Sequence, residues 1–358
     1  MKIAILCYGL SGLGGTETVL KSWFSFFEHN NIGFKVIVFN HLDNTDFIEG
    51  KNYELIEKNT SFKLRLSLAK DFIKNQYDIV ICFTPKYARY AQFARMFCFR
   101  KKPKIVFLSH FTFRGPSIIG KNMLREKDKK ELDNCDAIFA LCESMVKEYV
   151  NFGVSAENIH LIFNPIKNPN YYIPHSKDRN KFVFIGRLDD NHKDIKGIID
   201  VFASIERPFH LDIIGSGSDE ESLLSYINEK GEVFRQKVTL TGKWMVDPWK
   251  SIKEVDALIL NSRYEGFGMV LAEAMARGVP CISTDCYVGP SDIIKHGVNG
   301  YLFEPGDQKS FKSSIYKIMD GELKSSQDQI SATVEHMYEK AYYKRFNELL
   351  NMLCSSNK

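Results

Sequence analysis

NSRYEGFGMVLAEAMARGVPCISTDCYVGPSDIIKHGVNGYLF, residues 261–303, is the stretch that decides the fold we expect. Within it, Glu265 follows a short apolar run, Gly266 and Gly268 keep a turn open, and an alanine-rich helical segment begins at Met269. Two more short apolar runs come after that segment. Strand, glycine-rich turn and helix in this order predict a parallel sheet covered by helices, with the turn at the carboxyl edge of the sheet.

The same alternation of strand and helix runs through the whole chain and starts twice. The strands expected in the first half are 2–7, 35–39, 79–83, 105–108, 137–141 and 159–162, with helices that include 17–29 and 62–74. Those expected in the second half are 182–185, 210–214, 238–241, 257–260, 280–283 and 300–303, with helices near 195–205, 220–230 and 269–277. We therefore expect an α/β protein with two doubly wound, Rossmann-like units in tandem.

A proline-rich segment, NPIKNPNYYIPHSKDRN at 164–180, separates the two halves and shows little periodicity. The tail of the chain is helical by its three–four apolar spacing and belongs to neither sheet by pattern. The domains we expect are an N-terminal domain over 1–165, a linker over 166–180, a C-terminal domain over 181–330 and a C-terminal helix over 331–358.

Length and composition exclude several classes of protein. The chain has 358 residues, of which 44% are hydrophobic and 26% charged, which suits two soluble domains and not a disordered or fibrous chain. No apolar run approaches the roughly 20 residues that a membrane-spanning helix needs. The start, MKIAILCYGL, is typical of a buried strand and not of a secretory signal, so a cytoplasmic location is expected.

The eight cysteines show no CxxC pair and no histidine partners at the spacing of metal ligands. Several lie inside apolar runs, where a free thiol behaves as a small hydrophobic side chain. Neither a disulfide framework nor a structural zinc is expected.

The net charge of +4 is too small to indicate nucleic acid as a partner, but it is unevenly distributed. Residues 1–165 carry 23 Lys and Arg against 17 Asp and Glu, and residues 79–125 contain no acid. The stretch 86–104 mixes cations with aromatic residues and, if helical, is a basic amphipathic segment suited to an anionic membrane. The alternative is a core helix with a solvated basic edge. The membrane or acceptor contacts expected here are Arg95, Arg100, Lys101 and Lys102.

A first glycine-rich loop, 11–15, joins a strand to a helix and includes Gly14 and Gly15. Glycines at such a turn let a phosphate approach the backbone N–H groups of the helix start. The loop departs from the GxGxxG dinucleotide fingerprint, and no acidic residue ends the second strand. A tight turn without a ligand is the alternative.

Cations and glycines also follow the strands of the second half. Arg187 lies just past the first strand of that half and Lys193 before its helix, so both are placed to hold a diphosphate. Gly215 and Gly217 follow the next strand, at another carboxyl end, and are expected to take part in binding the donor. A salt-bridge role for the strand-end arginine is the alternative.

Glu265 and Glu273 stand eight residues apart, one at the start of a helix and the other about two turns along it on the same side. The backbone N–H groups of Phe267, Gly268 and Met269 lie between them, at a helix N-terminus that favours an anionic or polar ligand.

The segments EGFGMVLAE, GVNGYLF, GGTETVL, GRL with a lysine six residues after its arginine, and IIGSGSDEESL together resemble glycosyltransferase family 4, retaining enzymes with the GT-B fold. The resemblance covers nearly the whole chain. It implies two Rossmann-like domains and a C-terminal helix that crosses back to the first. The segments SHF at 109–111, WMVDPW at 244–249 and TDCYVGPSDIIKHGVNG at 284–300 further resemble the branch of that family that transfers galactose to lipopolysaccharide.

The resemblance implies roles for the matching residues. Arg187 and Lys193 would neutralise the diphosphate of the donor, Glu273 would bind ribose hydroxyls, and Glu265 with the amides after it would hold the transferred sugar. In addition, Gly14 and Gly15 would close over the phosphates, His110 would contact the donor sugar, and the uracil would lie beside the turn 242–244, where stacking on Trp244 stays open.

One position departs from the family pattern. The family usually follows its phosphate-binding lysine with glycine, whereas this chain has Asp194 after Lys193. Lys196 is followed by Gly197 and is therefore the rival.

The implied activity is retaining transfer of galactose or glucose from a UDP-sugar to a lipopolysaccharide or lipooligosaccharide core or a related cell-surface glycan. No Asp-x-Asp triplet occurs, so we expect neither a metal nor any other cofactor. The expected partners are the UDP-hexose, a lipid-linked saccharide acceptor and the anionic cytoplasmic face of the inner membrane. The alternatives are a nucleotide-sugar epimerase of the same fold, a capsule or other polysaccharide glycosyltransferase, and a sugar-nucleotide sensor.

Overall fold

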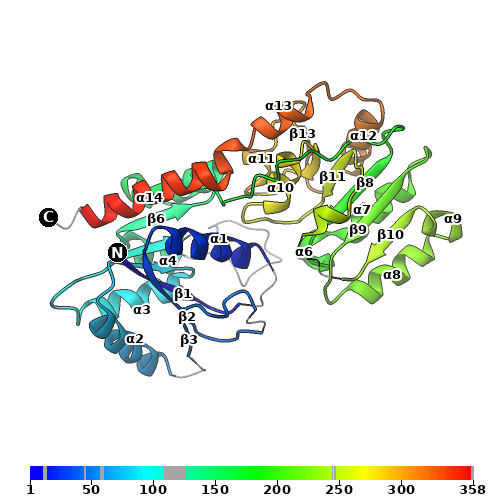
Figure 1. The fold of residues 1–358 in the computed structure, drawn as a ribbon. Coiled ribbons are helices and arrows are strands. Elements are labelled where there is room, and N and C mark those ends of the chain that lie inside the picture. Colours follow the sequence, from blue (N-terminus) through cyan, green and yellow to red (C-terminus); the bar gives the residue numbers. More distant parts are fainter. Residues whose placement is uncertain are drawn as a thin grey trace. The chain divides into compact units, whose positions relative to one another are not determined.

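A computed structural model describes residues 1–10, 14–43, 46–56, 60–108, 126–243, 245 and 247–355. The chain forms two compact units, one made of residues 1–165 with 339–358 and the other of residues 166–338. Each unit is a parallel sheet with helices packed on it (Figure 1). Among the described residues, no helix is both long enough and apolar enough to cross a membrane.

The first unit contains a seven-stranded parallel sheet in the order β3-β2-β1-β4-β5-β6-β7. Its strands are β1 (Lys2–Cys7), β2 (Gly33–Val38), β3 (Tyr53–Leu55), β4 (Ile79–Cys82), β5 (Lys104–Leu108), β6 (Ala137–Ala140) and β7 (Ile159–Leu161). The helices that follow them are α1 (Gly15–His29), α2 (Ser61–Asn75), α3 (Pro85–Arg95), α4 (Glu126–Asp133) and α5 (Glu143–Asn151). The six strands expected from the sequence are confirmed. The short edge strand β3 was not predicted, because its three residues are partly exposed and give no apolar run.

The C-terminal helix α14 (Glu339–Ser355) belongs to the first unit, which confirms the expected return of this helix. The indole N–H of Trp23 donates to the hydroxyl of Tyr342 over 2.8 Å, and its ring stacks on Phe346 at 4.9 Å between centroids. Residues 331–338, which we expected to be part of this helix, lie in the second unit instead. They stay there because Val334 and Met337 are buried and Thr333 accepts a hydrogen bond from Asn299.

The second unit contains a six-stranded parallel sheet in the order β10-β9-β8-β11-β12-β13. Its strands are β8 (Lys181–Ile185), β9 (His210–Ile214), β10 (Val238–Thr241), β11 (Ala257–Leu260), β12 (Cys281–Thr284) and β13 (Gly300–Phe303). Its helices include α6 (Asp190–Lys193), α7 (Ile195–Ala203), α8 (Glu220–Glu229), α9 (Glu232–Arg235), α10 (Met269–Ala276), α11 (Pro290–Ile293), α12 (Gln308–Met319) and α13 (Gln327–Ala332). All six strands expected in this half are confirmed.

Residues 166–180, the expected linker, are held against the second unit. The N–H of Ile173 donates to the carbonyl of Arg277 over 3.0 Å, and the amide of Gln327 donates to the Ile173 carbonyl over 2.6 Å. The N–H of Val255 donates to the Pro174 carbonyl over 3.0 Å. The segment lacks helix and strand but is fixed by these hydrogen bonds.

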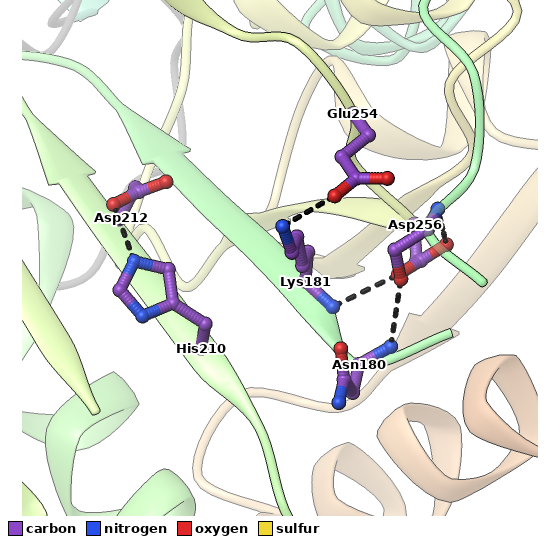
Figure 2. A network of polar contacts seen from close by, with 7 residues as sticks. Asn180, Lys181, His210, Asp212, Glu254 and Asp256 are labelled. Atoms are coloured by element: carbon purple, nitrogen blue, oxygen red, sulfur yellow. Dashed lines mark hydrogen bonds and ion pairs between the residues drawn. The ribbon is translucent and has the colours of Figure 1, made fainter. Parts of the chain in front are cut away.

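A polar network secures this segment at the amino edge of the second sheet (Figure 2). Asp256, fully buried before β11, accepts hydrogen bonds from the N–H and hydroxyl of Ser176 and from the N–H of Lys181. Burial alone would raise the pKa of Asp256, but these hydrogen bonds and the imidazole of His175 hold that pKa below its ordinary value. Because the network lies where the strands begin, it is a structural element and not the ligand site expected where they end.

Candidate active site

The candidate site of the second unit lies at the carboxyl edge of its sheet. The neighbouring strands β9, β8 and β11 end there, and each is followed by a loop with residues singled out from the sequence. In doubly wound sheets, ligands bind in the crevice outside the carboxyl ends of the strands.

Lys193 and Glu265 form the centre of this site. The ammonium of Lys193, at the end of α6, lies 2.5 Å from Oε1 of Glu265, and the hydroxyl of Ser262 donates to the same oxygen over 2.6 Å. Their side chains are only 13% and 9% exposed. Burial alone would raise the pKa of Glu265, but the charge and hydrogen bond of Lys193 lower it below the ordinary value. Glu265 is therefore an ionised carboxylate in a fixed orientation, able to accept a hydrogen bond from a ligand hydroxyl.

Lys196 points elsewhere. Its ammonium lies 5.2 Å from the ring centre of Tyr226 on α8, a cation–π contact. Of the two lysines, only Lys193 contacts Glu265.

Asp194, the departure from the family pattern, has left-handed backbone angles with φ of 47°. Glycine adopts this conformation most easily and aspartate tolerates it better than most residues, which explains why a glycine is usual here. The side chain of Asp194 pairs with Arg263 and accepts a hydrogen bond from Asn261 over 2.8 Å. These contacts join the turn after α6 to the loop after β11, which holds Glu265.

Gly215 and Gly217 let two loops of the site pack against each other. A Cβ atom on Gly215 would lie 1.8 Å from the carbonyl oxygen of Gly186, and one on Gly217 would lie 2.2 Å from that of Leu188. The N–H of Leu188 also donates to the carbonyl of Ser216 over 2.9 Å. The glycines therefore shape the loop that carries Arg187, whose side chain is exposed.

At the N-terminus of α10, two backbone segments again lie close to each other. Gly268 caps the helix with φ of +86° and no side chain, so the first N–H groups of α10 are not covered by a capping side chain. A Cβ on Gly289 would lie 2.6 Å from the carbonyl oxygen of Phe267, which is buried. Gly266 and Met269 flank these residues and are half-buried.

Glu273, four residues into α10, is held by a residue that the sequence did not single out as a site residue. The indole N–H of Trp249 donates to Oε2 of Glu273 over 3.2 Å. Arg277 lies 5.0 Å from the Trp249 ring and donates to the backbone carbonyl of Glu273. Burial raises the pKa of Glu273 above its ordinary value, against the opposing effect of Trp249. Trp249 ends the segment WMVDPW, in which the sequence singles out only Trp244, and Pro248 starts the short helix that places it.

In the first unit, Gly14 precedes α1 and its carbonyl accepts hydrogen bonds from the N–H and hydroxyl of Thr18. Gly15 is the first residue of α1. His110 and Trp244 lie outside the described residues.

The four basic residues expected at a membrane differ in their surroundings. Arg95 pairs with Asp136, and Lys101 lies 2.6 Å from Asp78, so these two cations are neutralised by neighbours. Arg100 and Lys102 are exposed. The helix α3 is largely a core element, with Tyr87, Ala88, Tyr90, Ala91 and Ala94 buried.

The eight cysteines are free thiols. Within the described residues, no group of three or more His, Cys, Asp or Glu side chains is arranged to hold a metal ion.

Two family models match the chain, Glycosyltransferase Family 4 over residues 14–167 and Glycosyl transferases group 1 over residues 172–336. The lipopolysaccharide 1,6-galactosyltransferase of Salmonella typhimurium is 32% identical over 98% of both chains, and that of Escherichia coli K12 is 30% identical over the whole of both. The chain belongs to glycosyltransferase family 4.

Solved structures agree with this membership. The glycosyltransferase resembles the apo form of the lipopolysaccharide outer core galactosyltransferase WaaB with a TM-score of 0.84, at 30% identity and over 98% of this chain and 99% of that one. Anabaena HepE, at 18% identity, has the same fold with a TM-score of 0.81 over 98% of this chain and 100% of that one. The two-domain GT-B fold that the resemblance implied is therefore confirmed.

Proposed function

We propose that this family 4 glycosyltransferase is a retaining hexosyltransferase that moves galactose or glucose from a UDP-sugar to a lipopolysaccharide or lipooligosaccharide core. The observation that carries the proposal is the match to two lipopolysaccharide 1,6-galactosyltransferases along the full chain. The UDP and UDP-glucose complexes of HepE, which has the same fold, support a UDP-sugar as donor.

The geometry at the carboxyl edge of the second sheet supports the donor half of this proposal. Arg187 and Lys193 neutralise the diphosphate as the glycosidic bond breaks, because fixed positive charge stabilises the leaving group in the transition state. Glu265, held ionised by Lys193, accepts a hydrogen bond from a hydroxyl of the transferred hexose, and the backbone N–H groups of Phe267, Gly268 and Met269 donate hydrogen bonds to the oxygens of that sugar. In this assignment no metal ion is required to neutralise the diphosphate.

Glu273, positioned by Trp249, accepts hydrogen bonds from the ribose hydroxyls. The Cβ distances of Gly215 and Gly217 assign these glycines to shaping the Arg187 loop. The role of Gly14 and Gly15 at the phosphates stays a prediction. The contacts of His110 with the sugar and of Trp244 with the uracil stay predictions.

The acceptor half of the proposal is a lipid-linked core saccharide at the cytoplasmic face of the inner membrane. The positive excess of residues 1–165 supports it, because each Lys or Arg near an anionic surface adds about 1 kcal/mol of attraction. Exposed Arg100 and Lys102 contribute to this attraction, whereas Arg95 and Lys101 are neutralised by their acidic partners.

A donor screen tests the proposal. The protein is incubated with UDP-galactose, UDP-glucose and GDP-hexoses, with and without core oligosaccharide, and release of the nucleotide is measured. We expect UDP release from one UDP-hexose and acceleration by the acceptor. Conversion of the UDP-sugar without acceptor to an epimer would identify an epimerase, and binding of UDP without turnover on any acceptor would identify a sensor. Turnover only with capsule or other polysaccharide acceptors would support the proposed donor and contradict the proposed acceptor.

A further inference from the structure

Large apolar side chains are exposed along α2 and in the turn after α3. On α2, Phe62 is 61% exposed and Ile73 is 53% exposed, with Leu66 between them at 37%. In the turn, Phe99 is 89% exposed and Met96 is 70% exposed. Exposed large apolar side chains that cluster mark an interaction surface more often than scattered ones do.

The exposed apolar residues of α2 lie on one narrow stripe. At about 100° per residue, Phe62, Leu66 and Ile73 fall within roughly 40° of one another around the helix. The opposite side of α2, with Leu64, Leu68 and Phe72, is buried. Exposed lysines border the stripe on its outer side: Lys63, Lys70 and Lys74.

Side-chain contacts join α2 to α3, its neighbour in the first unit (Figure 1). The guanidinium of Arg65 lies 5.0 Å from the ring centre of Tyr90 and 5.7 Å from that of Phe93. Phe93 in turn contacts Phe97, with 5.2 Å between ring centres. Both helices run from the carboxyl to the amino edge of a parallel sheet, so Ile73 and the turn after α3 lie at the same edge.

The charge of this region is positive. The segments 60–75 and 96–102 contain a single acidic residue, Asp71. Its carboxylate lies 2.6 Å from the ammonium of Lys35, and both side chains are 14% exposed, so it offers little negative charge to the surface. The α2 surface is defined here as Phe62, Leu66, Ile73, Met96, Phe97 and Phe99 with the cations Lys63, Lys70, Lys74, Arg100 and Lys102.

We propose that the α2 surface docks this enzyme on an anionic lipid bilayer, with its apolar side chains inserted at the headgroup boundary and its cations against anionic headgroups. A helix with exposed aromatic and aliphatic residues beside lysines is suited to lie in the plane of such an interface. This inference rests on the membrane-bound acceptor of the proposed function. It assigns the membrane contact to the α2 surface, which does not include Arg95 and Lys101, two of the residues expected at a membrane from the sequence. A second copy of the chain fits less well, because a two-fold contact would bring the lysine rows of both copies together.

Flotation of the full chain with vesicles tests the α2 surface. The vesicles contain phosphatidylglycerol with phosphatidylethanolamine, or neutral phosphatidylcholine. The apolar variant is Phe62→Ser/Leu66→Ser/Ile73→Ser, and the charge variant is Lys63→Gln/Lys70→Gln/Lys74→Gln. Val233→Ser is the matched control, because Val233 is 73% exposed on the second unit.

We expect the parent protein and the Val233→Ser control to bind the anionic vesicles. The partition coefficient of the apolar variant onto the vesicles should fall roughly tenfold or more at every salt concentration, because the free energy of inserting apolar side chains does not come from screened charges. The charge variant should lose affinity mainly at low salt. Circular dichroism should show unchanged melting for both variants, because the substituted residues are exposed.

The inference would be overturned if the folded apolar variant bound the vesicles as well as the parent protein does. It would also be overturned if the parent protein were a dimer and the apolar variant a monomer that still bound the vesicles. UDP release with a delipidated core oligosaccharide separates this inference from the proposed function. Turnover by the apolar variant at the parental rate, together with lost vesicle binding, supports both. No turnover by any protein, with the vesicle results as expected, would contradict the proposed function alone.

Discussion

At the scale of single residues, the structure distinguishes two lysines that the sequence left as rivals. Lys193 contacts the buried carboxylate of Glu265, whereas Lys196 lies over Tyr226. The separation arises because left-handed Asp194 ends α6 and redirects the chain into α7. A three-residue spacing alone could not reveal that break.

The exchange Lys193→Gln should lower turnover by roughly tenfold or more, because the amide can still donate to Glu265 but brings no positive charge to the leaving diphosphate. Lys196→Gln is the matched control and should retain most of the activity. UDP release at saturating donor measures both. If Lys193→Gln kept near-parental turnover and Lys196→Gln lost it, Lys196 and not Lys193 would be the lysine that contacts the diphosphate.

Burial of Glu273 leads to a prediction for stability against pH. Its folded pKa is raised above the ordinary value of 4.5, so the ionised carboxylate destabilises the folded state once the pH rises above the folded pKa. Glu273→Gln should therefore raise the melting temperature at pH 8, and the gain should shrink as the pH falls towards 4.5. The same variant should raise the KM for the donor. A melting temperature of Glu273→Gln lower than that of the parent at pH 8 would contradict the destabilising effect of the ionised Glu273 carboxylate.

At the scale of elements, most strands follow from the sequence because central strands such as β4, β6 and β11 are short, fully buried apolar runs. The edge strand β3 escaped prediction because it is partly exposed. The segment 166–180 was expected as a linker because prolines exclude regular structure, yet side-chain and backbone hydrogen bonds fix it to the second unit. Such contacts between distant parts of the chain leave no local pattern.

Gly217 gives the prediction at this scale. A Cβ there would lie 2.2 Å from a backbone oxygen, so Gly217→Ala must move the loop that carries Arg187. Overpacking of this kind costs about 1–3 kcal/mol of stability, and we expect a lower melting temperature together with reduced turnover. Gly33→Ala is the control, because its nearest atoms would be 3.6 and 3.8 Å away. Equal melting temperatures and activities for the two variants would contradict this role of the loop.

At the scale of the whole molecule, the candidate site lies in the second unit and the basic stretch 86–104 in the first. In the second unit Lys193 contacts Glu265 beyond the strand ends, and Glu273 lies on α10, the helix that follows Glu265. The sequence singles out these residues by their order after strands and their spacing, and their roles toward a donor stay predictions. It did not reveal that Trp249 holds Glu273, since a tryptophan 24 residues away gives no spacing signal. The basic stretch 86–104 is evident from the sequence, but only the structure distinguishes its cations that pair with acids, Arg95 and Lys101, from its exposed ones.

The central claim is transfer of a hexose from a UDP-sugar to a lipopolysaccharide core, and analysis of the product tests it most directly. Core oligosaccharide is incubated with the protein and UDP-galactose or UDP-glucose, and the product is examined by mass spectrometry and by NMR of its anomeric proton. We predict the gain of one hexose, with the anomeric configuration of the donor retained. Consumption of the UDP-sugar while the oligosaccharide keeps its mass, or a product of inverted configuration, would contradict the account.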